Sequence, residues 1–317
     1  MAPAPSALTV IGDIGLDFVL GPLAHWPERG TELIIDQHEM RPGFSAANAA
    51  LAARHLGASC TLVGDVGDDP LGYWLVSELA GIDARIAHLP ASTTTTVAVL
   101  HDDAERTFMT TRGHLELVTW SAMSARIPRA APGGIALMTG VFLMPQIEHD
   151  YPLILADLNA RGYRVAVDTG WPPSGWTVEL RQAASQWMQH CDILLLNETE
   201  VLHLAAKENL EEALRELAAM LAPGGIAVAK TGSKGASACS GARICDAKAV
   251  RLNVIDTIGA GDSFNAGFLL ALGAGAGAEL TEALKTACRT ASTIISKFPR
   301  QSILPAELAQ ILGTKRS

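Results

Sequence analysis

A run of small residues that ends in a carboxylate, Asp-Thr-Ile-Gly-Ala-Gly-Asp, occupies positions 256–262. Phe264 and Phe268 follow four residues apart, which predicts that a helix begins near Ala260 and buries that face. A glycine-rich helix N-terminus lets an anion approach free backbone N–H groups, and the helix dipole favours negative charge there. A phosphoryl group fits such a pocket, and Asp262 in the first turn is placed to accept a proton from a bound hydroxyl.

A purely structural interpretation of these residues is also open. Gly259 and Gly261 then form an ordinary turn, and Asp262 is a helix-start residue that the dipole favours. The longer string at positions 256–267 favours chemistry, because it resembles the C-terminal signature DTxGAGDxFxxG of the PfkB carbohydrate kinases. The resemblance implies ATP-dependent phosphorylation of a small-molecule hydroxyl, with Asp262 as the base and Gly259, Ala260 and Gly261 as the anion-binding turn.

Other motifs follow in the order typical of that family, so the resemblance covers nearly the whole chain. Gly-Asp-Ile-Gly-Leu-Asp at positions 12–17 follows the first predicted strand and is similar to the family's first substrate-binding turn. This similarity implies that Asp13, Gly15 and Asp17 line the substrate pocket. Ordinary turn carboxylates, which are common after any strand, are the alternative.

The stretch Gly-Phe-Ser-Ala-Ala-Asn at positions 43–48 is similar to the family's N-terminal signature GGxxxN. Gly43 and Asn48 match the sugar-contacting positions of that signature. Phe44 replaces its second glycine, which predicts a crowded backbone approach to the substrate. A helix-start turn with a small-residue packing face is the alternative.

Two further motifs are assigned to the nucleotide and its metal. Asn197 and Glu200 match the family's NxxE motif, which implies that Glu200 orients water on Mg²⁺; a capping box at a helix start is the alternative. Residues 230–236 follow another predicted strand and resemble the glycine-containing turn that borders the ATP phosphates. The predicted nucleotide-binding residues are therefore Asn197, Lys230, Thr231, Gly232 and Gly235, although an ordinary hairpin turn also fits the latter segment.

A monovalent cation is a further expectation from the resemblance. Relatives often bind one beside the anion pocket, at positions equivalent to Asp256 and Ile258 and in a later loop, so K⁺ is a candidate cofactor. The corresponding loop here, residues 297–302, lacks the small Gly-Ala pair of many relatives.

These motifs must be positioned by alternating strands and helices. Short apolar runs predict strands at residues 8–14, 60–66, 93–100, 134–140, 163–169, 192–196 and 225–230. Helical patterns such as residues 211–221 lie between most of them, which predicts an α/β fold with a three-layer, doubly wound, mostly parallel sheet. We expect one domain over residues 1–317.

Two segments break this alternation. Residues 17–42 and 92–112 alternate apolar and polar side chains without an intervening helix, and a turn is predicted at residues 101–104. They are interpreted as a small antiparallel lid, with an antiparallel edge of the main sheet as the alternative. Pairing of two lids would cover their edge strands, so a homodimer is expected.

The composition of the chain limits the classes of partner that are expected. Lys and Arg number 24 against 33 Asp and Glu, and no basic run occurs, so neither nucleic acid nor an anionic membrane is an expected partner. Five scattered cysteines predict neither a disulfide framework nor a zinc site, and no signal peptide or long apolar run is present, so a cytoplasmic enzyme is expected. P-loop, dinucleotide, zincin and serine-hydrolase motifs are absent from the sequence.

The substrate is left open by these patterns. A free sugar is favoured by analogy with the family, a nucleoside is the alternative, and a non-catalytic sugar- or nucleotide-binding regulator is a third reading. Arg112 can neutralise an acid sugar or be a solvated charge of the lid. Trp171 can stack on a substrate ring or cover the core.

Overall fold

The protein is described by a computed structural model that covers residues 8–101, 105–252, 254–273 and 279–296. The predicted cation loop at residues 297–302 and the tip of the predicted turn, residues 102–104, lie outside the described residues. Among the helices that are described, none combines the length and the apolar character needed to cross a membrane.

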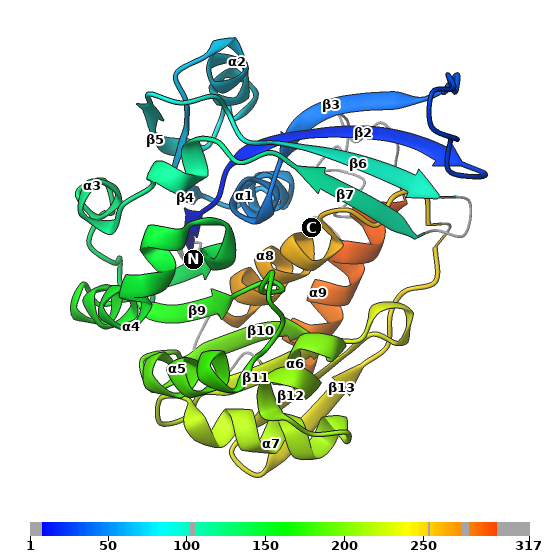
Figure 1. Cartoon of the computed structure of the whole chain (residues 1–317). Helices are drawn as coiled ribbons and strands as arrows, with labels where there is room; N and C mark the ends of the chain where they lie inside the picture. Colours follow the sequence, from blue (N-terminus) through cyan, green and yellow to red (C-terminus); the bar gives the residue numbers. More distant parts are fainter. Residues whose placement is uncertain (1–7, 102–104, 253, 274–278, 297–317) are drawn as a thin grey trace, which may run out of the picture.

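A nine-stranded sheet forms the centre of the molecule (Figure 1). In sheet order its strands are β13 (Arg243–Ala247), β12 (Ala236–Ser240), β11 (Ile226–Lys230), β10 (Ile193–Asn197), β9 (Arg164–Asp168), β8 (Ile135–Thr139), β1 (Leu8–Gly12), β4 (Cys60–Gly67) and β5 (Asp83–Leu89). The pairings from β11 to β5 are parallel, while β12 and β13 add an antiparallel edge. The predicted mostly parallel sheet is thus confirmed.

Helices cover both faces of this sheet, because each central strand is apolar on both sides. Val10 of β1 packs in one apolar layer and its neighbour Ile11 in the other. The first layer contains α1 (Ser45–His55), α2 (Pro70–Glu78), α8 (Ala260–Gly273) and α9 (Leu280–Ile295). The second contains α3 (Trp120–Ser124), α4 (Pro145–Ala160), α5 (Val178–Met188), α6 (Glu198–Ala205) and α7 (Leu210–Met220). The three-layer architecture follows.

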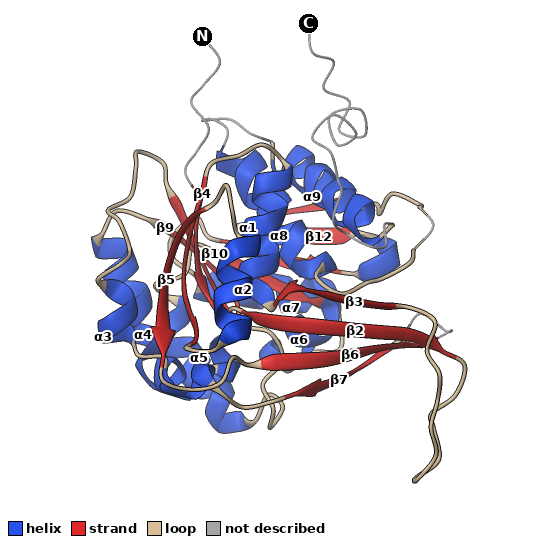
Figure 2. Ribbon diagram, turned by 90° about the horizontal axis from the view of Figure 1, so that it is seen from above, coloured by secondary structure: helices blue, strands red, loops and turns tan. Residues whose placement is uncertain are grey.

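A second, four-stranded sheet lies beside the first (Figure 2). We call it the small sheet; its strands in order are β3 (His38–Gly43), β2 (Gly15–Leu23), β6 (Thr95–His101) and β7 (Arg106–Thr110). Its outer pairs are antiparallel and its central pair, β2 with β6, is parallel. The residues predicted to form a lid thus build a sheet of their own, and the antiparallel edge of the main sheet comes from β12 and β13. Closure of the small sheet over a substrate stays a prediction.

Candidate active site

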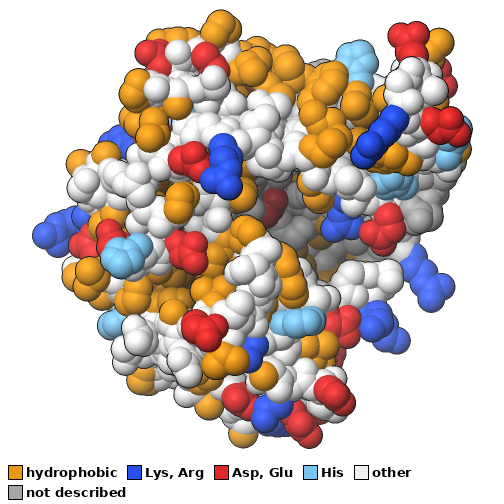
Figure 3. Space-filling view, viewed as in Figure 1, with side chains coloured by type: hydrophobic (Ala, Val, Ile, Leu, Met, Phe, Trp, Pro, Cys, Tyr) orange, Lys and Arg blue, Asp and Glu red, His pale blue; other side chains and the backbone are white. Residues whose placement is uncertain are grey.

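Several polar or small residues, some of them predicted site residues, stand at the carboxyl ends of neighbouring parallel strands. Asp13 follows β1, Gly140 follows β8, Asp168 ends β9, Asn197 ends β10 and Lys230 ends β11. The ends of parallel strands meet at one edge of the sheet, where α/β proteins bind ligands. Figure 3 shows this face of the molecule hollowed between the small sheet and the main body, with acidic atoms at the bottom of the hollow.

Asp262 lies in the first turn of α8, as predicted, and is partly buried. Its Oδ2 accepts a hydrogen bond of 3.1 Å from Nδ2 of Asn48, a residue of α1. Burial raises the pKa of Asp262 to about 7, and the charges of Asp168 and Asp13 act in the same direction while Lys230 opposes them. The result is a carboxylate more basic than usual that still ionises near neutral pH, as a general base requires.

The turn before Asp262 is held by its own backbone. The N–H of Ala260 donates to the carbonyl of Thr257 at 3.2 Å, and the hydroxyl of Ser263 donates to the carbonyl of Gly259 at 2.8 Å. Gly261 and Asp262 lie in the first helical turn, whose N–H groups have no acceptor within the helix. These amides are therefore the ones oriented to bind an anion.

A buried network that the sequence analysis did not predict supports this turn. The ammonium of Lys230 and the amide of Asn265 both donate to Oδ2 of Asp168, each at 2.6 Å. Burial alone would lower the pKa of Lys230, but the carboxylates of Asp168 and Glu200 outweigh burial and raise it. Lys230 Nζ also lies next to Gly261. A permanent positive charge is thus fixed beside the anion-binding turn.

Asp168 and Asn265 carry signals that would have identified them. Asp168 ends a predicted strand, and the ends of parallel strands are where ligands bind in this fold class. Asn265 lies three residues after Asp262, on the same face of α8.

Asp13 is the second carboxyl group of the site with a strongly raised pKa. Burial raises the pKa of Asp13 to about 7, although its Oδ1 accepts a hydrogen bond of 3.2 Å from the N–H of Ala46. Gly140, which has a positive φ of 73°, faces the carboxyl group closely enough that a side chain there would collide with it. The absence of a side chain at Gly140 thus makes room for Asp13.

The predicted substrate residues of the small sheet form a second group. Gly15 of β2 pairs with Gly43 of β3, and a side chain at Gly43 would collide with the buried carboxylate of Asp17. Phe44 follows with φ 68° and ψ 166°, a conformation that few residues other than glycine adopt, and its ring lies against Gly15. The Phe44 ring thus occupies the space beside Gly15, and its effect on the approach to a substrate stays a prediction.

Asn197 and Glu200 form the capping box that was the structural alternative for this motif. The N–H of Asn197 donates to Oε2 of Glu200 at 2.8 Å, and the N–H of Glu200 donates to Oδ1 of Asn197 at 2.9 Å. Burial raises the pKa of Glu200 to about 7, with a further contribution from the charge of Asp168. The metal role is compatible with this geometry, because a carboxylate has a second oxygen.

The predicted phosphate-bordering turn joins β11 to β12, which pair as a hairpin. The N–H of Thr231 donates to the carbonyl of Gly235 at 2.9 Å, and a short 3₁₀ turn spans Gly232–Lys234. Asn197 and Lys230 are direct neighbours in the β10–β11 register. The predicted nucleotide residues therefore lie together at one end of two adjacent strands.

The two residues considered for substrate discrimination both lie at the surface. The Arg112 side chain is 87% exposed and pairs with Glu116 at 2.6 Å. Trp171 is half-exposed and packs edge-on against His203. The geometry therefore favours a solvated charge at Arg112.

The predicted cation residues belong to a different set of contacts. Oδ1 of Asp256 accepts a hydrogen bond of 2.8 Å from the N–H of Ile258. Its Oδ2 lies 2.7 Å from the guanidinium of Arg41, a residue of the small sheet that the sequence analysis did not single out. The Asp256 carboxylate is thus engaged on both oxygens.

Comparison with known proteins agrees with this arrangement. Residues 6–307 match the family described as pfkB family carbohydrate kinase. The chain is 25% identical to ribokinase of Bacillus subtilis (strain 168) over 319 residues, which cover 96% of this chain and 99% of that protein. It is 28% identical to fructokinase of Klebsiella pneumoniae over 242 residues, which cover 74% and 77% of the two chains.

Solved structures show the same fold. The crystal structure of adenosine kinase from Sinorhizobium meliloti superposes with a TM-score of 0.78 at 22% identity, over 97% of this chain and 99% of that one. The ribokinase-like architecture is therefore confirmed. The match over nearly the full length shows that this chain belongs to the PfkB family of carbohydrate kinases, phosphotransferases that act on an alcohol group.

Proposed function

We propose that this protein transfers the γ-phosphoryl group of ATP to a hydroxyl of a free sugar, with Asp262 as the general base. The observation that carries the proposal is the partly buried Asp262 carboxylate, which accepts a hydrogen bond from Asn48 and lies in the same helical turn as the anion-oriented amides. Desolvation raises the pKa of this carboxylate to about 7. A proton acceptor and an anion site next to each other are what phosphoryl transfer to an alcohol requires.

The reaction assigns one task to each group. The substrate oxygen attacks the γ-phosphorus, the bond from that phosphorus to the β,γ-bridging oxygen breaks, and the hydroxyl proton passes to Asp262. The amides of Gly261 and Asp262, together with Lys230, stabilise the charge on the transferred group. Asp13, Asp17 and Asn48 hold the acceptor. ADP leaves with the electron pair of the broken bond, so atoms and charge balance.

Magnesium fits the oxygen donors at this edge of the sheet. One oxygen of Glu200 is used by Asn197, and the other is available for a water of a hydrated ion. In the part of the chain that the structure describes, no group of three His, Cys, Asp or Glu side chains could hold a metal ion. A Mg²⁺ ion carried mainly by the nucleotide phosphates agrees with this donor set, and it would offset the phosphate charge.

The charges around Asp262 support a neutral acceptor. Asp13 and Asp168 add negative charge at Asp262, whereas Lys230 is already paired with Asp168. Arg112, which would suit an acid sugar, points to solvent. An anionic substrate would therefore meet repulsion at the acceptor side. A nucleoside remains the alternative neutral acceptor, in keeping with the similarity to an adenosine kinase structure.

The test is substrate-dependent ADP release from Mg-ATP across neutral sugars, sugar acids, sugar phosphates and nucleosides. We expect the largest kcat/KM with a neutral sugar and loss of turnover in Asp262→Asn. A nucleoside as the best acceptor would replace the sugar proposal. ATP binding without turnover on any acceptor would favour the non-catalytic regulator.

We also propose a homodimer formed through the small sheets. Met40 and Met109, which the strand register places on the same face of this sheet, are 40 and 48% exposed, so an apolar surface is available to a second copy. Sedimentation equilibrium at micromolar concentration is expected to give twice the chain mass. A monomer at all concentrations would exclude this arrangement.

A further inference from the structure

A buried ion pair connects the small sheet to the segment that leads into the anion-binding turn. Arg41 of β3 donates to Oε2 of Glu39 at 2.8 Å, and its other terminal nitrogen lies 2.7 Å from Oδ2 of Asp256. The Arg41 and Asp256 side chains are 8% and 0% exposed. Water screens such a buried pair little, so its electrostatic attraction is stronger than that of a surface ion pair.

The carboxylate of Asp256 passes this constraint to the backbone of the turn. Its second oxygen accepts the N–H of Ile258 at 2.8 Å, which fixes the chain immediately before Gly259. The N–H of Asp256 itself donates to the carbonyl of Ile295 at the end of α9 at 3.2 Å. Asp256 therefore links three elements: the small sheet, the turn and α9.

Ile258 adds an apolar contact to the same connection. Its buried side chain clusters with Val19 of β2 and with Ala98 and Leu100 of β6, all residues of the small sheet. Asp256 and Ile258 thus both turn toward the small sheet. The residue that follows, Gly259, begins the turn that presents the amides beside Asp262.

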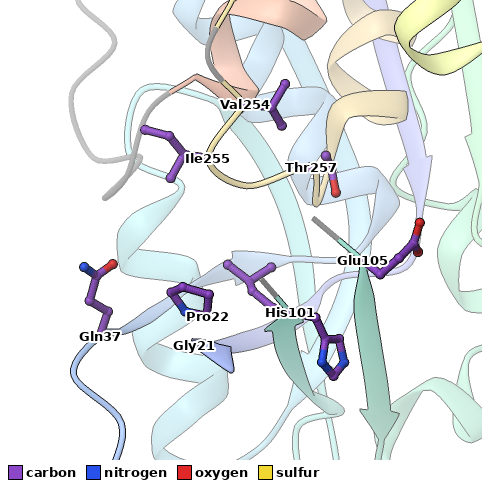
Figure 4. Close-up of a pocket in the computed structure, with 9 residues that line it drawn as sticks. Gly21, Pro22, Gln37, His101, Glu105, Val254, Ile255 and Thr257 are labelled. Carbon is purple, nitrogen blue, oxygen red and sulfur yellow. The ribbon is translucent and has the colours of Figure 1, made fainter. Parts of the chain in front are cut away.

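Two neighbouring residues of this segment face a cavity on the other side. Ile255 and Thr257 line a cavity of about 210 Å³ together with Pro22, Gln37 and His101 (Figure 4). Ile255 remains 47% exposed. Beside this open packing, Arg41, Asp256 and Ile258 join the small sheet to the turn.

From this geometry we infer that Arg41 is a positioning residue for phosphoryl transfer: through Asp256 it couples the small sheet to the anion-binding turn. The inference rests on the proposed function, since the turn is taken to hold the transferred phosphoryl group. Displacement of the small sheet then misplaces the amides of Gly261 and Asp262. The chemical step depends on that placement, and because β2 of the same sheet carries Asp17, the affinity for the sugar falls as well.

The test compares Arg41→Met, Asp256→Asn and the double variant with the wild type, and uses Arg106→Met as the control. Arg106 is an exposed arginine of β7 in the same sheet. With the acceptor that the wild type phosphorylates best, Arg41→Met is expected to lower kcat by about tenfold or more, beyond any rise in the sugar KM. The kcat of the double variant is expected to be no lower than that of either single variant, because each single change already removes the same ion pair. Arg41→Lys is expected to restore part of kcat.

Hydrogen exchange of the peptide that contains Ile258 gives a readout without catalysis. Faster exchange there in Arg41→Met, with the control unchanged, would support the coupling even if no acceptor were found. Wild-type turnover that survives Arg41→Met, or additive losses in the double variant, would overturn the inference and leave the kinase proposal standing. Should Arg41→Met not fold, Asp256→Asn decides: unchanged kcat and unchanged exchange in that variant would also overturn it.

Discussion

Replacement of Asp262 by asparagine tests the central chemical assignment. Asparagine keeps the size of the side chain and an oxygen that can accept the Asn48 hydrogen bond, now 3.1 Å long, but it cannot take a proton. General-base catalysis contributes about 10²- to 10⁴-fold, so kcat is expected to fall by that factor, about 3 to 5 kcal/mol of transition-state stabilisation. Sugar binding is expected to survive.

The pH dependence gives a second measure of the same group. Burial raises the pKa of Asp262 to about 7, and only the ionised form can act as a base. One pH unit below that pKa roughly a tenth of the carboxylate is ionised, so log kcat/KM is expected to rise with pH and to level off above neutrality. Burial also raises the pKa of Asp13 to about 7, so the acidic side of the wild-type profile of log kcat/KM against pH reflects the ionisation of both groups. The acidic side of the Asp262→Asn profile is expected to have a smaller slope.

The assay is coupled ADP release, with coupling enzymes in excess at every pH and with sugar affinity measured by calorimetry. Asp157→Asn is the control, because Asp157 is a partly exposed carboxylate of α4 that pairs with Arg161. Turnover of Asp262→Asn close to that of the control would refute the base assignment. Loss of sugar binding together with turnover would mean that Asp262 holds the substrate instead of accepting its proton.

Three further predictions concern stability and cations. Burial raises the folded pKa of Asp262 from 3.8 to about 7, so the stability that its protonated form contributes is full below about pH 4 and is lost between about pH 4 and 7. Asp262→Asn should therefore raise Tm more at pH 8 than at pH 5, and an equal shift at both would contradict this. Phe44→Gly should be more stable to urea than Phe44→Ala by about 1 to 3 kcal/mol, because only glycine relieves the positive φ; equal stabilities would argue against strain. Exchange of K⁺ for tetramethylammonium should leave kcat nearly unchanged, because Arg41 already neutralises Asp256; a large fall would support a K⁺ site at Asp256 and Ile258.

The layers and the chemistry of α8 could be predicted because their signals are local. Apolar runs predicted the parallel strands. Each such strand is buried on both faces, so it needs a continuous run of apolar residues that can be recognised in the sequence. A glycine-rich segment before a helical apolar stripe predicts an anion site for the same reason: the free N–H groups belong to the helix terminus itself. The role of Asp262 as the base stays a prediction, which rests on the resemblance of residues 256–267 to the family signature.

The pairings between distant residues could not be predicted in this way. No property of Lys230 alone indicates that it meets Asp168, 62 residues away, and no property of Arg41 indicates a partner at Asp256. The raised pKa of Asp262 likewise depends on burial and on charges from other strands. By itself, the sequence determined the sheet, the helix termini and the type of chemistry. Only the tertiary structure decided which charges face one another, because that depends on strand order and on how the small sheet meets the turn.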